Sequence, residues 1–317
     1  MSQVIVLGDA CVDMVIHLPD HRAEPPDLTH SAPQLFGGGS GANVAVALAR
    51  LGVAVMMVGA VGDDGYGRWL CEDLSREGVD AKGVCPVRDA FTPMVMALIE
   101  PNGERLVVVW PPEGGAHHHL QAEAINPAWI TAAAWLHTTG LCLRESPTRE
   151  AVLFAMQQAQ EAGVPVSLDL NMRLELWGLD NETRRVFERA IALSDFVLGN
   201  GEEEIRPLTG ADSVEAGAKQ LGDGQRIVVA RQGSQGALVA TPQETFHMPA
   251  FQVEVVNTLG AGDAFNGGFI AACLAKVGIK EAVRWGNAVA ALNISHDGAR
   301  SLPSLADLQC LLGTTTP

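Results

Sequence analysis

The chain has 317 residues, of which 47% are hydrophobic, and a formal net charge of −16 at neutral pH. An acidic excess repels nucleic acids and anionic membranes, and since no local basic patch offsets it, we expect neither as a partner. No apolar run is long enough to cross a membrane and no basic stretch precedes an apolar one at the start of the chain, so we expect a cytoplasmic protein without a signal peptide.

Apolar runs alternate along the chain with helical patterns. Strands are predicted near residues 4–7, 54–61, 135–139, 164–170, 195–198 and 226–231. Helices are predicted between them, near residues 42–51, 65–77, 147–162, 181–193 and 214–221. This alternation is typical of an α/β fold with a doubly wound, mostly parallel sheet, and because no linker divides residues 1–317, we expect a single domain.

Two neighbouring segments depart from this alternation. Met94–Glu100 and Arg105–Trp110 are apolar runs on either side of Pro-Asn-Gly-Glu, in which Asn-Gly is a strong signal for a β-hairpin. With the extended residues 13–36, the segment 91–112 is predicted to form a small β lid. A dimerisation edge is the alternative reading of the same hairpin.

The histidine triplet at residues 117–119 has the composition of a metal site, but no second His or Cys motif lies near it. A solvated loop is the better interpretation. The six cysteines have no paired spacing, and we expect them to be reduced and mostly buried as small hydrophobic side chains.

A glycine cluster at residues 36–43 leads into the helix predicted near 42–51. That helix is apolar on almost all sides, which predicts that it is buried and that its glycine-rich entry is held rigidly. Asn43 then needs hydrogen-bond partners at this entry. Backbone groups are the commoner partners of a single Asn, and the hydroxyl groups of a ligand are the alternative.

A second glycine turn, Gly260-Ala261-Gly262, precedes Asp263 and an apolar helical run. Glycines let the N–H groups at such a helix start point together, and a helix start favours negative charge. Phosphoryl transfer needs this arrangement, because fixed donors must stabilise the migrating group while a carboxylate accepts the proton of the attacking hydroxyl. Asp263 is therefore the candidate base, and the alternative is a turn that only caps a buried helix.

With these two motifs, at residues 37–52 and 257–265, the chain resembles the ribokinase-like (PfkB) carbohydrate kinase family over almost all of its length. The resemblance implies a ribokinase-like fold, ATP and Mg²⁺ as cofactors, and a lid that keeps water from the γ-phosphate. It implies that Asp263 is the catalytic base, that Gly260, Ala261 and Gly262 form the anion hole, and that Asp13, Gly39, Ser40 and Asn43 bind the sugar. In this family the lid hairpin is also often a dimer contact.

The resemblance extends to the nucleotide side of the site. Asn200 and Glu203 match the family's N-x-x-E motif, which implies that Asn200 lies near the phosphates and that Glu203 organises Mg²⁺ through water. The turn under the nucleotide is matched by Arg231, Gly233, Ser234 and Gly236. Asn287 matches a residue beside the adenine, and packing inside a helix pair explains an Asn at that position equally well.

One residue departs from the family pattern. Where members that use K⁺ commonly have Asp, this chain has Asn257, and the later part of the ion loop is expected at residues 293–301. An amide keeps an oxygen ligand but removes a full negative charge. The substitution therefore weakens the expectation that a monovalent cation activates this protein.

The substrate class rests on the segment 167–177, which is similar to the D-x-N-x-R…W segment of fructokinases, aminoimidazole riboside kinases and 2-keto-3-deoxygluconate kinases. Arg173 in this segment is a candidate for binding an ATP phosphate or a sugar-acid carboxylate, and a surface ion pair is the alternative. We expect ATP-dependent phosphorylation of a primary hydroxyl on a furanose or keto-sugar. The alternatives are a riboside kinase and, from another class, a non-catalytic sugar-binding sensor. A nicotinamide-binding fold is disfavoured, since residues 37–41 lack the G-x-G-x-x-G spacing.

Overall fold

The computed structural model describes residues 3–20 and 32–313. Its strands are Val4–Leu7 (β1), Cys11–His17 (β2), Gln34–Gly38 (β3), Val55–Gly62 (β4), Asp80–Val87 (β5), Met94–Ile99 (β6), Arg105–Trp110 (β7), Trp135–Thr139 (β8), Val166–Asp169 (β9), Phe196–Asn200 (β10), Ile227–Arg231 (β11), Ala237–Ala240 (β12) and Thr245–Met248 (β13). Its α-helices are Ser40–Arg50 (α1), Gly65–Arg76 (α2), Pro127–Thr131 (α3), Thr148–Glu161 (α4), Leu174–Trp177 (α5), Asn181–Ala192 (α6), Arg206–Thr209 (α7), Val214–Gly222 (α8), Ala261–Leu274 (α9), Ile279–Ile294 (α10) and Leu305–Leu312 (α11).

A nine-stranded sheet has the order β13-β12-β11-β10-β9-β8-β1-β4-β5. The strands from β11 to β5 pair in parallel, while β12 and β13 are antiparallel additions at one edge. The predicted mostly parallel, doubly wound sheet is confirmed, and each of the eleven predicted strands and helices has a counterpart within a few residues. The sequence prediction did not include β5, β12 or β13.

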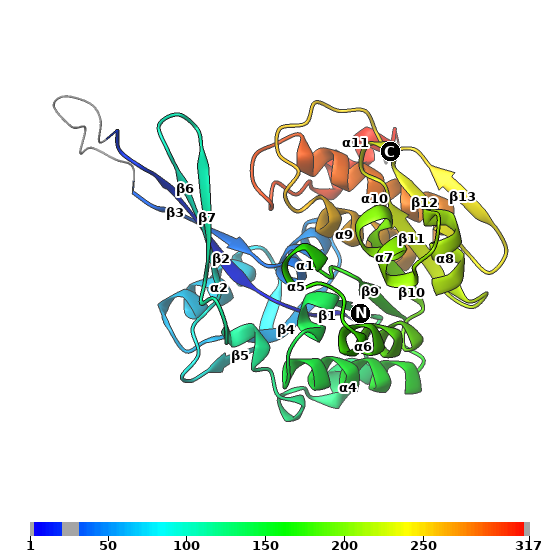
Figure 1. The fold of residues 1–317 in the computed structure, drawn as a ribbon, viewed down its shortest axis with the longest axis horizontal. Coiled ribbons are helices and arrows are strands. Elements are labelled where there is room, and N and C mark those ends of the chain that lie inside the picture. The colour runs from blue at the N-terminus through cyan, green and yellow to red at the C-terminus, as the bar shows by residue number, and fades with distance from the viewer. Residues whose placement is uncertain (1–2, 21–31, 314–317) are drawn as a thin grey trace.

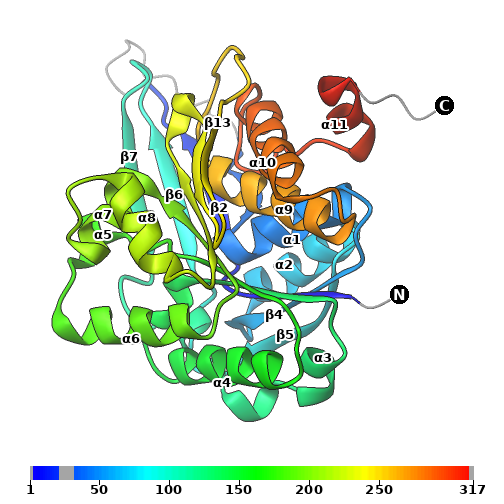
Figure 2. The same cartoon turned by 90° about the vertical axis from the view of Figure 1, so that its right-hand side faces the viewer.

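The large sheet has a helical layer on each face (Figure 2). Successive residues of β1 alternate between the two cores, because side chains of a strand point to opposite faces. Val4 and Val6 pack with the side of α1, α9 and α10, whereas Ile5 and Leu7 pack with the side of α4 and α6. A strand buried on both faces is apolar throughout, which explains why a continuous hydrophobic run marked it in the sequence.

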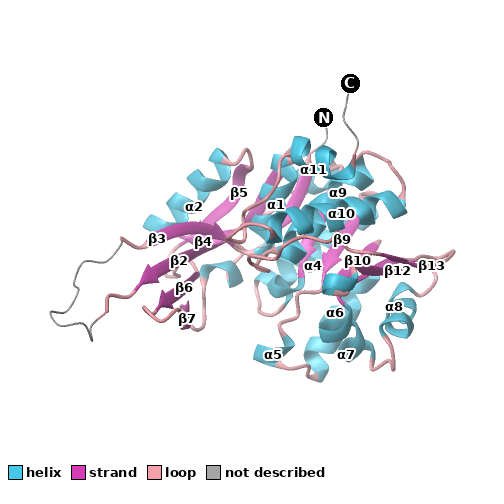
Figure 3. Ribbon diagram, turned by 90° about the horizontal axis from the view of Figure 1, so that it is seen from above, coloured by secondary structure: helices cyan, strands magenta, loops and turns pink. Residues whose placement is uncertain are grey.

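The second sheet has four strands in the order β3-β2-β6-β7 and extends away from the helical body (Figures 1 and 3). The predicted hairpin is present: β6 and β7 pair antiparallel around a turn in which Asn102 Oδ1 accepts from Glu104 N at 2.9 Å. The strand β2 pairs with both β3 and β6, so the segments 13–36 and 91–112 do join one sheet. Residues 21–31 of the expected lid lie outside the described chain.

Two expectations about single residue types need correction. The histidine triplet is not a solvated loop: His118 is buried in a 3-10 turn, burial lowers the pKa of His117 to about 3, and only His119 is exposed. All six cysteines are free, but Cys142 alone is fully buried and Cys310 is exposed. Among the described helices, none combines the length and apolar character needed to cross a membrane.

Candidate active site

Polar residues gather at the carboxyl ends of the strands of the large sheet, because parallel strands all end on the same side of a sheet. Asp9 follows β1, Asp169 ends β9, Asn200 ends β10 and Arg231 ends β11. Adjacent registers place Asn200 beside Arg231 and Leu198 beside Asp169. The starts of α1 and α9 lie at the same place, so two helix N-termini and four strand ends supply the site.

The carboxylate of Asp263, in the first turn of α9, is held by two donors from the first turns of α1. Ser40 Oγ donates to Asp263 Oδ1 at 2.6 Å, and Asn43 Nδ2 donates to Asp263 Oδ2 at 2.9 Å. Burial raises the pKa of Asp263 to about 7, and the negative charges of Asp169 and Asp9 add to the rise. The side-chain donors lower the pKa, because they stabilise the ionised form. The two glycine motifs of the sequence therefore meet at this one carboxylate.

Asp9 anchors the start of α1. Its carboxylate accepts from Ser40 N at 3.0 Å and from Gly41 N at 3.1 Å, so it satisfies two of the helix's first N–H groups. A Cβ on Gly41 would lie 2.7 Å from Gly8 Cα, so only glycine lets the helix start approach β1 this closely. Sequence reasoning did not single out Asp9, although its place directly after a buried strand was a usable signal.

A buried ion pair between Arg231 and Asp169 contacts the turn before Asp263. Arg231 Nη2 lies 2.6 Å from Asp169 Oδ1, and Arg231 Nη1 donates to Gly262 O at 3.1 Å. Asn266 Nδ2 donates to Asp169 Oδ2 at 2.7 Å and completes the network. The Arg231 guanidinium therefore makes its hydrogen bonds to groups inside the protein, next to the predicted anion hole.

The anion-hole turn has the backbone that its glycines predicted. Gly260 has φ of 76°, in the left-handed region, and a Cβ there would lie 2.5 Å from Ala299 O. The helix α9 begins at Ala261, so Ala261, Gly262 and Asp263 form its first turn. The N–H groups of a first turn have no partner within their own helix, which makes a helix start suited to binding an anion. Here Ala261 N donates to Thr258 O at 3.3 Å, in the turn that precedes the helix.

Asp13 lies on β2 of the small sheet, beside the glycine entry to α1. A Cβ on Gly38 would lie 2.6 Å from the Asp13 carboxylate oxygens, and Gly39, with φ of 94°, leads directly into Ser40. Partial burial raises the pKa of Asp13, while a hydrogen bond from Cys11 and the charge of Arg300 lower it. The structure therefore brings the predicted sugar-side residues together around the start of α1.

Asn200 and Glu203 form a local unit after β10. Asn200 Oδ1 accepts from Glu202 N at 3.0 Å and Glu203 N at 3.1 Å, and Asn200 Nδ2 donates to Glu203 Oε2 at 2.9 Å. The neighbouring Glu204, missed in the sequence, is buried and accepts from Asn200 N and Met172 N, each at 2.7 Å. Burial raises the pKa of Glu204.

The remaining residues predicted for the nucleotide side lie in separate networks. Gly233, Ser234 and Gly236 form a tight turn between β11 and β12, closed by Gln232 N donating to Gly236 O at 2.7 Å. Asn287 donates to Met248 O at 3.3 Å and to Pro249 O at 3.0 Å, so its N–H groups tie α10 to the chain after β13.

Asn257, at the position that departs from the family pattern, faces a carboxylate. Its Nδ2 donates to Asp297 Oδ1 at 2.8 Å, and its Oδ1 accepts from Leu259 N at 2.9 Å. The amide thus bridges the turn before α9 and the loop after α10.

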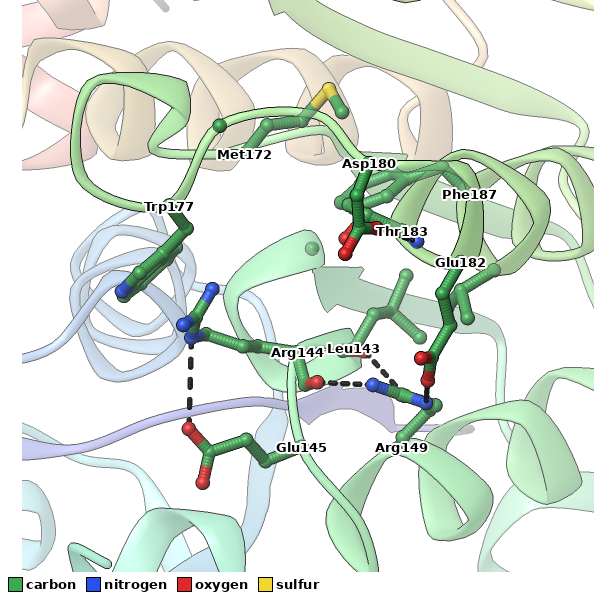
Figure 4. Close-up of a pocket in the computed structure, with 13 residues that line it drawn as sticks. Leu143, Arg144, Glu145, Arg149, Met172, Trp177, Asp180, Glu182, Thr183 and Phe187 are labelled. Carbon is green, nitrogen blue, oxygen red and sulfur yellow. Dashed lines mark hydrogen bonds and ion pairs between the residues drawn. The ribbon is translucent and has the colours of Figure 1, made fainter. Parts of the chain in front are cut away.

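A cavity of about 180 Å³ lies next to α5 (Figure 4). The guanidinium of Arg144 stacks over the ring of Trp177 at 4.0 Å, and Arg149 pairs with Glu182 at 2.8 Å. None of the sequence-predicted site residues lines it. Arg173, which precedes α5, is exposed and has φ of 49°.

The chain is similar over most of its length to known carbohydrate kinases. Residues 1–305 match the family model of the pfkB family carbohydrate kinases. The chain is 36% identical over 304 residues to an ATP-dependent ribose-1-phosphate kinase of Halopiger xanaduensis, and the match covers 96% of each chain. It is 32% identical over 307 residues to the aminoimidazole riboside kinase of Salmonella typhimurium, with 94% of this chain and 91% of the relative covered.

Among solved structures, a Vibrio cholerae fructokinase variant bound to fructose, ADP and potassium ion matches with a TM-score of 0.82 and 32% identity over 98% of both chains. The sequence resemblance is therefore confirmed over nearly the whole chain. This chain belongs to the pfkB family of carbohydrate kinases.

Proposed function

We propose that the protein catalyses ATP-dependent phosphorylation of a primary hydroxyl group on a small sugar, with Asp263 as the general base. The observation that carries the proposal is the placement of the Asp263 carboxylate between the donors of Ser40 and Asn43, in the first turn of α9. A pKa near 7 suits a general base, because about half of the group is ionised at neutral pH and the ionised form binds a proton more strongly than an ordinary carboxylate does.

In the proposed reaction the sugar hydroxyl gives its proton to Asp263 as its oxygen attacks the γ-phosphorus of ATP, and ADP leaves. The N–H groups around Gly260, Ala261 and Gly262 meet the charge of the transferred group. The contact of Arg231 with Gly262 O supports a role for Arg231 in holding this turn next to the nucleotide.

The sugar is proposed to bind between the small sheet and the start of α1. Asp13 accepts from its hydroxyl groups, and Gly39, Ser40 and Asn43 surround it. The small sheet is proposed to serve as the lid that excludes water from the phosphate. This assignment is supported by the proximity of Asp13 to Gly38 and of Ser40 and Asn43 to Asp263.

On the nucleotide side, Asn200 is proposed to lie near the phosphates, with the turn of Gly233, Ser234 and Gly236 under the nucleotide and Asn287 near the adenine. Mg²⁺ fits the Asn200–Glu203 unit, whose exposed oxygens are the kind of ligand it takes. The described part of the chain has no group of three or more His, Cys, Asp or Glu side chains that would hold a metal directly. A Mg²⁺ ion there would keep several waters and neutralise phosphate charge, with Glu203 acting through water.

A furanose or keto-sugar is the proposed acceptor, and a riboside is the second candidate. The relatives named for fructose and for aminoimidazole riboside, each 32% identical to this chain, support both. The exposed Arg173 is the candidate for binding a phosphate or a carboxylate. A non-catalytic sugar sensor is the candidate from another class, and the intact Gly260–Asp263 turn and Asn200–Glu203 unit count against it.

A coupled assay of ADP release tests the proposal across sugars, sugar acids and nucleosides. Sugar-dependent ADP release, with formation of the phosphorylated sugar, is the expected result. Saturable sugar binding without ADP release would support the sensor instead. Faster turnover of a nucleoside than of any free sugar would replace the sugar by a riboside.

A further inference from the structure

Arg300 lies in the loop after α10 and joins segments that are far apart in the sequence. Its Nε donates to Asn43 Oδ1 at 2.9 Å, its Nη1 lies 2.6 Å from Asp73 Oδ2, and its Nη2 donates to Gly38 O at 3.1 Å. Only 10% of its side chain is exposed. The guanidinium therefore fixes the loop against α1, α2 and β3 at once.

The contact with Asn43 decides which way the Asn43 amide faces. An amide has one accepting oxygen and one donating NH₂ group, and a guanidinium can only donate. Because Arg300 Nε donates to Oδ1, the Nδ2 group of Asn43 is turned toward Asp263, where it donates at 2.9 Å. A chain of two hydrogen bonds thus links Arg300 to the proposed base.

We propose that Arg300 is a positioning residue for the general base: it orients the amide of Asn43 so that Asn43 donates to the Asp263 carboxylate. Because the inference rests on the proposed function of Asp263, its test must separate failure of the base from failure of the positioning. Without Arg300 the amide loses the donor that fixes its orientation, and the ionised form of Asp263 loses stabilisation. The acid limb of kcat/KM, below which Asp263 is protonated and cannot act as a base, should then move to higher pH.

Other charged groups also act on Asp263 and must be kept apart from this effect. Asp9 and Asp169 raise its pKa, and Arg231 is the nearby cation from β11. The hydrogen bonds that Arg300 makes in the described structure go to none of these three. A double-mutant cycle with Asn43 separates orientation from the simple loss of a positive charge.

Arg50, at the end of α1, provides a matched control. Arg50 donates to Arg300 O at 3.2 Å and to Leu302 O at 2.8 Å, and it pairs with Glu77 at 2.8 Å. It therefore holds the same loop through the loop's backbone, and its side-chain hydrogen bonds in the described structure go to Glu77, Arg300 O and Leu302 O rather than to Asn43 or Asp263. Arg50→Met tests what loosening the loop does without removing the contact to the amide.

The experiment measures kcat/KM for the best sugar substrate against pH in Arg300→Met, Arg50→Met, Asn43→Ala and the Asn43→Ala/Arg300→Met double variant. For Arg300→Met we expect the acid limb to move up by about one pH unit, since one hydrogen bond to a charged group is lost. From a starting pKa of about 7, kcat/KM should then fall about fivefold at pH 7 and about tenfold at pH 6 and below. The KM for ATP should stay unchanged. Arg50→Met should lower Tm and leave the acid limb in place.

The double-mutant cycle of Asn43→Ala and Arg300→Met tests whether Arg300 acts through Asn43. If Arg300 acts through Asn43, Arg300→Met adds no further shift in the Asn43→Ala background. An equal shift in both backgrounds, or an equal shift in Arg50→Met, would overturn the positioning role. Because Arg300→Met removes the shorter of the two ion pairs of Asp73 and leaves it only the pair with Arg76 at 3.4 Å, Arg300→Met combined with Asp73→Asn provides a variant without that charge, and it should show the same shift.

Asp263→Asn separates failure of the proposed base from failure of the positioning role of Arg300. If Asp263→Asn keeps near-normal turnover, the proposed base is wrong and the inference falls with it. If Asp263→Asn is inactive while Arg300→Met keeps the pH profile of the unmodified protein, only the positioning role is wrong.

Discussion

At Asp263, burial destabilises the ionised form of the carboxylate, while two hydrogen bonds hold the carboxylate in one orientation. Its surroundings raise its pKa to about 7 by removing water, yet Ser40 and Asn43 give it two hydrogen bonds that hold its orientation. Desolvation makes the group a stronger base, and the two donors limit the rise of its pKa, so that a substantial share of the group is still ionised at neutral pH.

Asp263→Asn removes the proton acceptor but keeps the size of the side chain. We expect turnover to fall by at least ~100-fold, the lower range for loss of a general base, with little change in ATP affinity. Steady-state kinetics and an equilibrium ATP-binding measurement check this. Near-normal turnover in a folded variant would contradict the assignment.

The pH dependence of the unmodified protein follows from the same group. A base must be ionised to accept a proton, so kcat/KM should fall about tenfold per pH unit below the Asp263 pKa of about 7 and level off above it. The measurement is kcat/KM for the sugar from pH 5 to pH 9. An acid limb near pH 4, the ordinary range of an aspartate, would show that Asp263 is not the titrating base.

Asp13→Ala removes an acceptor from the proposed sugar site and leaves the nucleotide side untouched. The sugar KM should rise about 10- to 100-fold, the cost of losing hydrogen bonds to a charged group, while the KM for ATP stays constant. Asp13→Asn, which keeps one acceptor oxygen, should give a smaller rise. A loss of ATP binding at unchanged sugar KM would place Asp13 in another site.

The start of α9 and the turn before it are held by the loop that follows α10. The loop after α10 contacts it through Ala299, against Gly260, and through Asp297, which accepts from Asn257 at 2.8 Å. The Asn257 amide thus links the segment before α9 to the Asp297 carboxylate.

Asn257→Asp would place a second carboxylate against Asp297. Two carboxylates at this distance repel unless a cation lies between them, so we expect the variant to gain activity when K⁺ is added. The unmodified protein should differ little between K⁺ and Na⁺. Titration of KCl against a bulky organic cation at constant ionic strength measures both, and a several-fold K⁺-specific rise in the unmodified protein would contradict the prediction.

At the scale of the whole molecule, the small sheet leaves apolar side chains uncovered. Leu106, Val107, Val109 and Trp110 on β7 are 47–60% exposed, whereas apolar side chains of the large sheet are mostly buried. These side chains lie on both faces of the edge strand, Val107 and Val109 on one and Leu106 and Trp110 on the other. Exposed apolar side chains gathered at one edge are typical of a surface that another chain covers. We propose that a second copy of this chain covers it, so that the small sheet serves as both lid and dimer contact.

Replacing Val107 and Val109 by Asp would bury charges in such a contact, so we expect the double variant to be monomeric. Sedimentation velocity of both proteins at several concentrations checks the expectation. Val277→Asp, at an exposed valine between α9 and α10, is the matched control and should leave the assembly state unchanged. A monomer in the unmodified protein, or a dimer in the double variant, would contradict the proposed contact.

The sequence alone determined the features whose signals are local. Strands buried on both faces are continuous apolar runs, so β1 and β4 were found within one residue at each end, and the Asn102-Gly103 turn marked the hairpin. The Gly260–Asp263 turn was recognised because its backbone requires small residues beside the carboxylate. These signals were sufficient for the fold class and for the family.

The tertiary structure decided what depends on contacts between distant segments. The donors of Asp263 come from α1, more than two hundred residues earlier in the chain, and Arg300 reaches Asn43 across a similar separation. Nothing near Arg231 in the sequence indicated that its guanidinium turns inward to Asp169, and nothing near His118 indicated its burial. A side chain's burial, pKa and hydrogen-bond partners depend on every segment packed around it, and local sequence specifies only one of those segments.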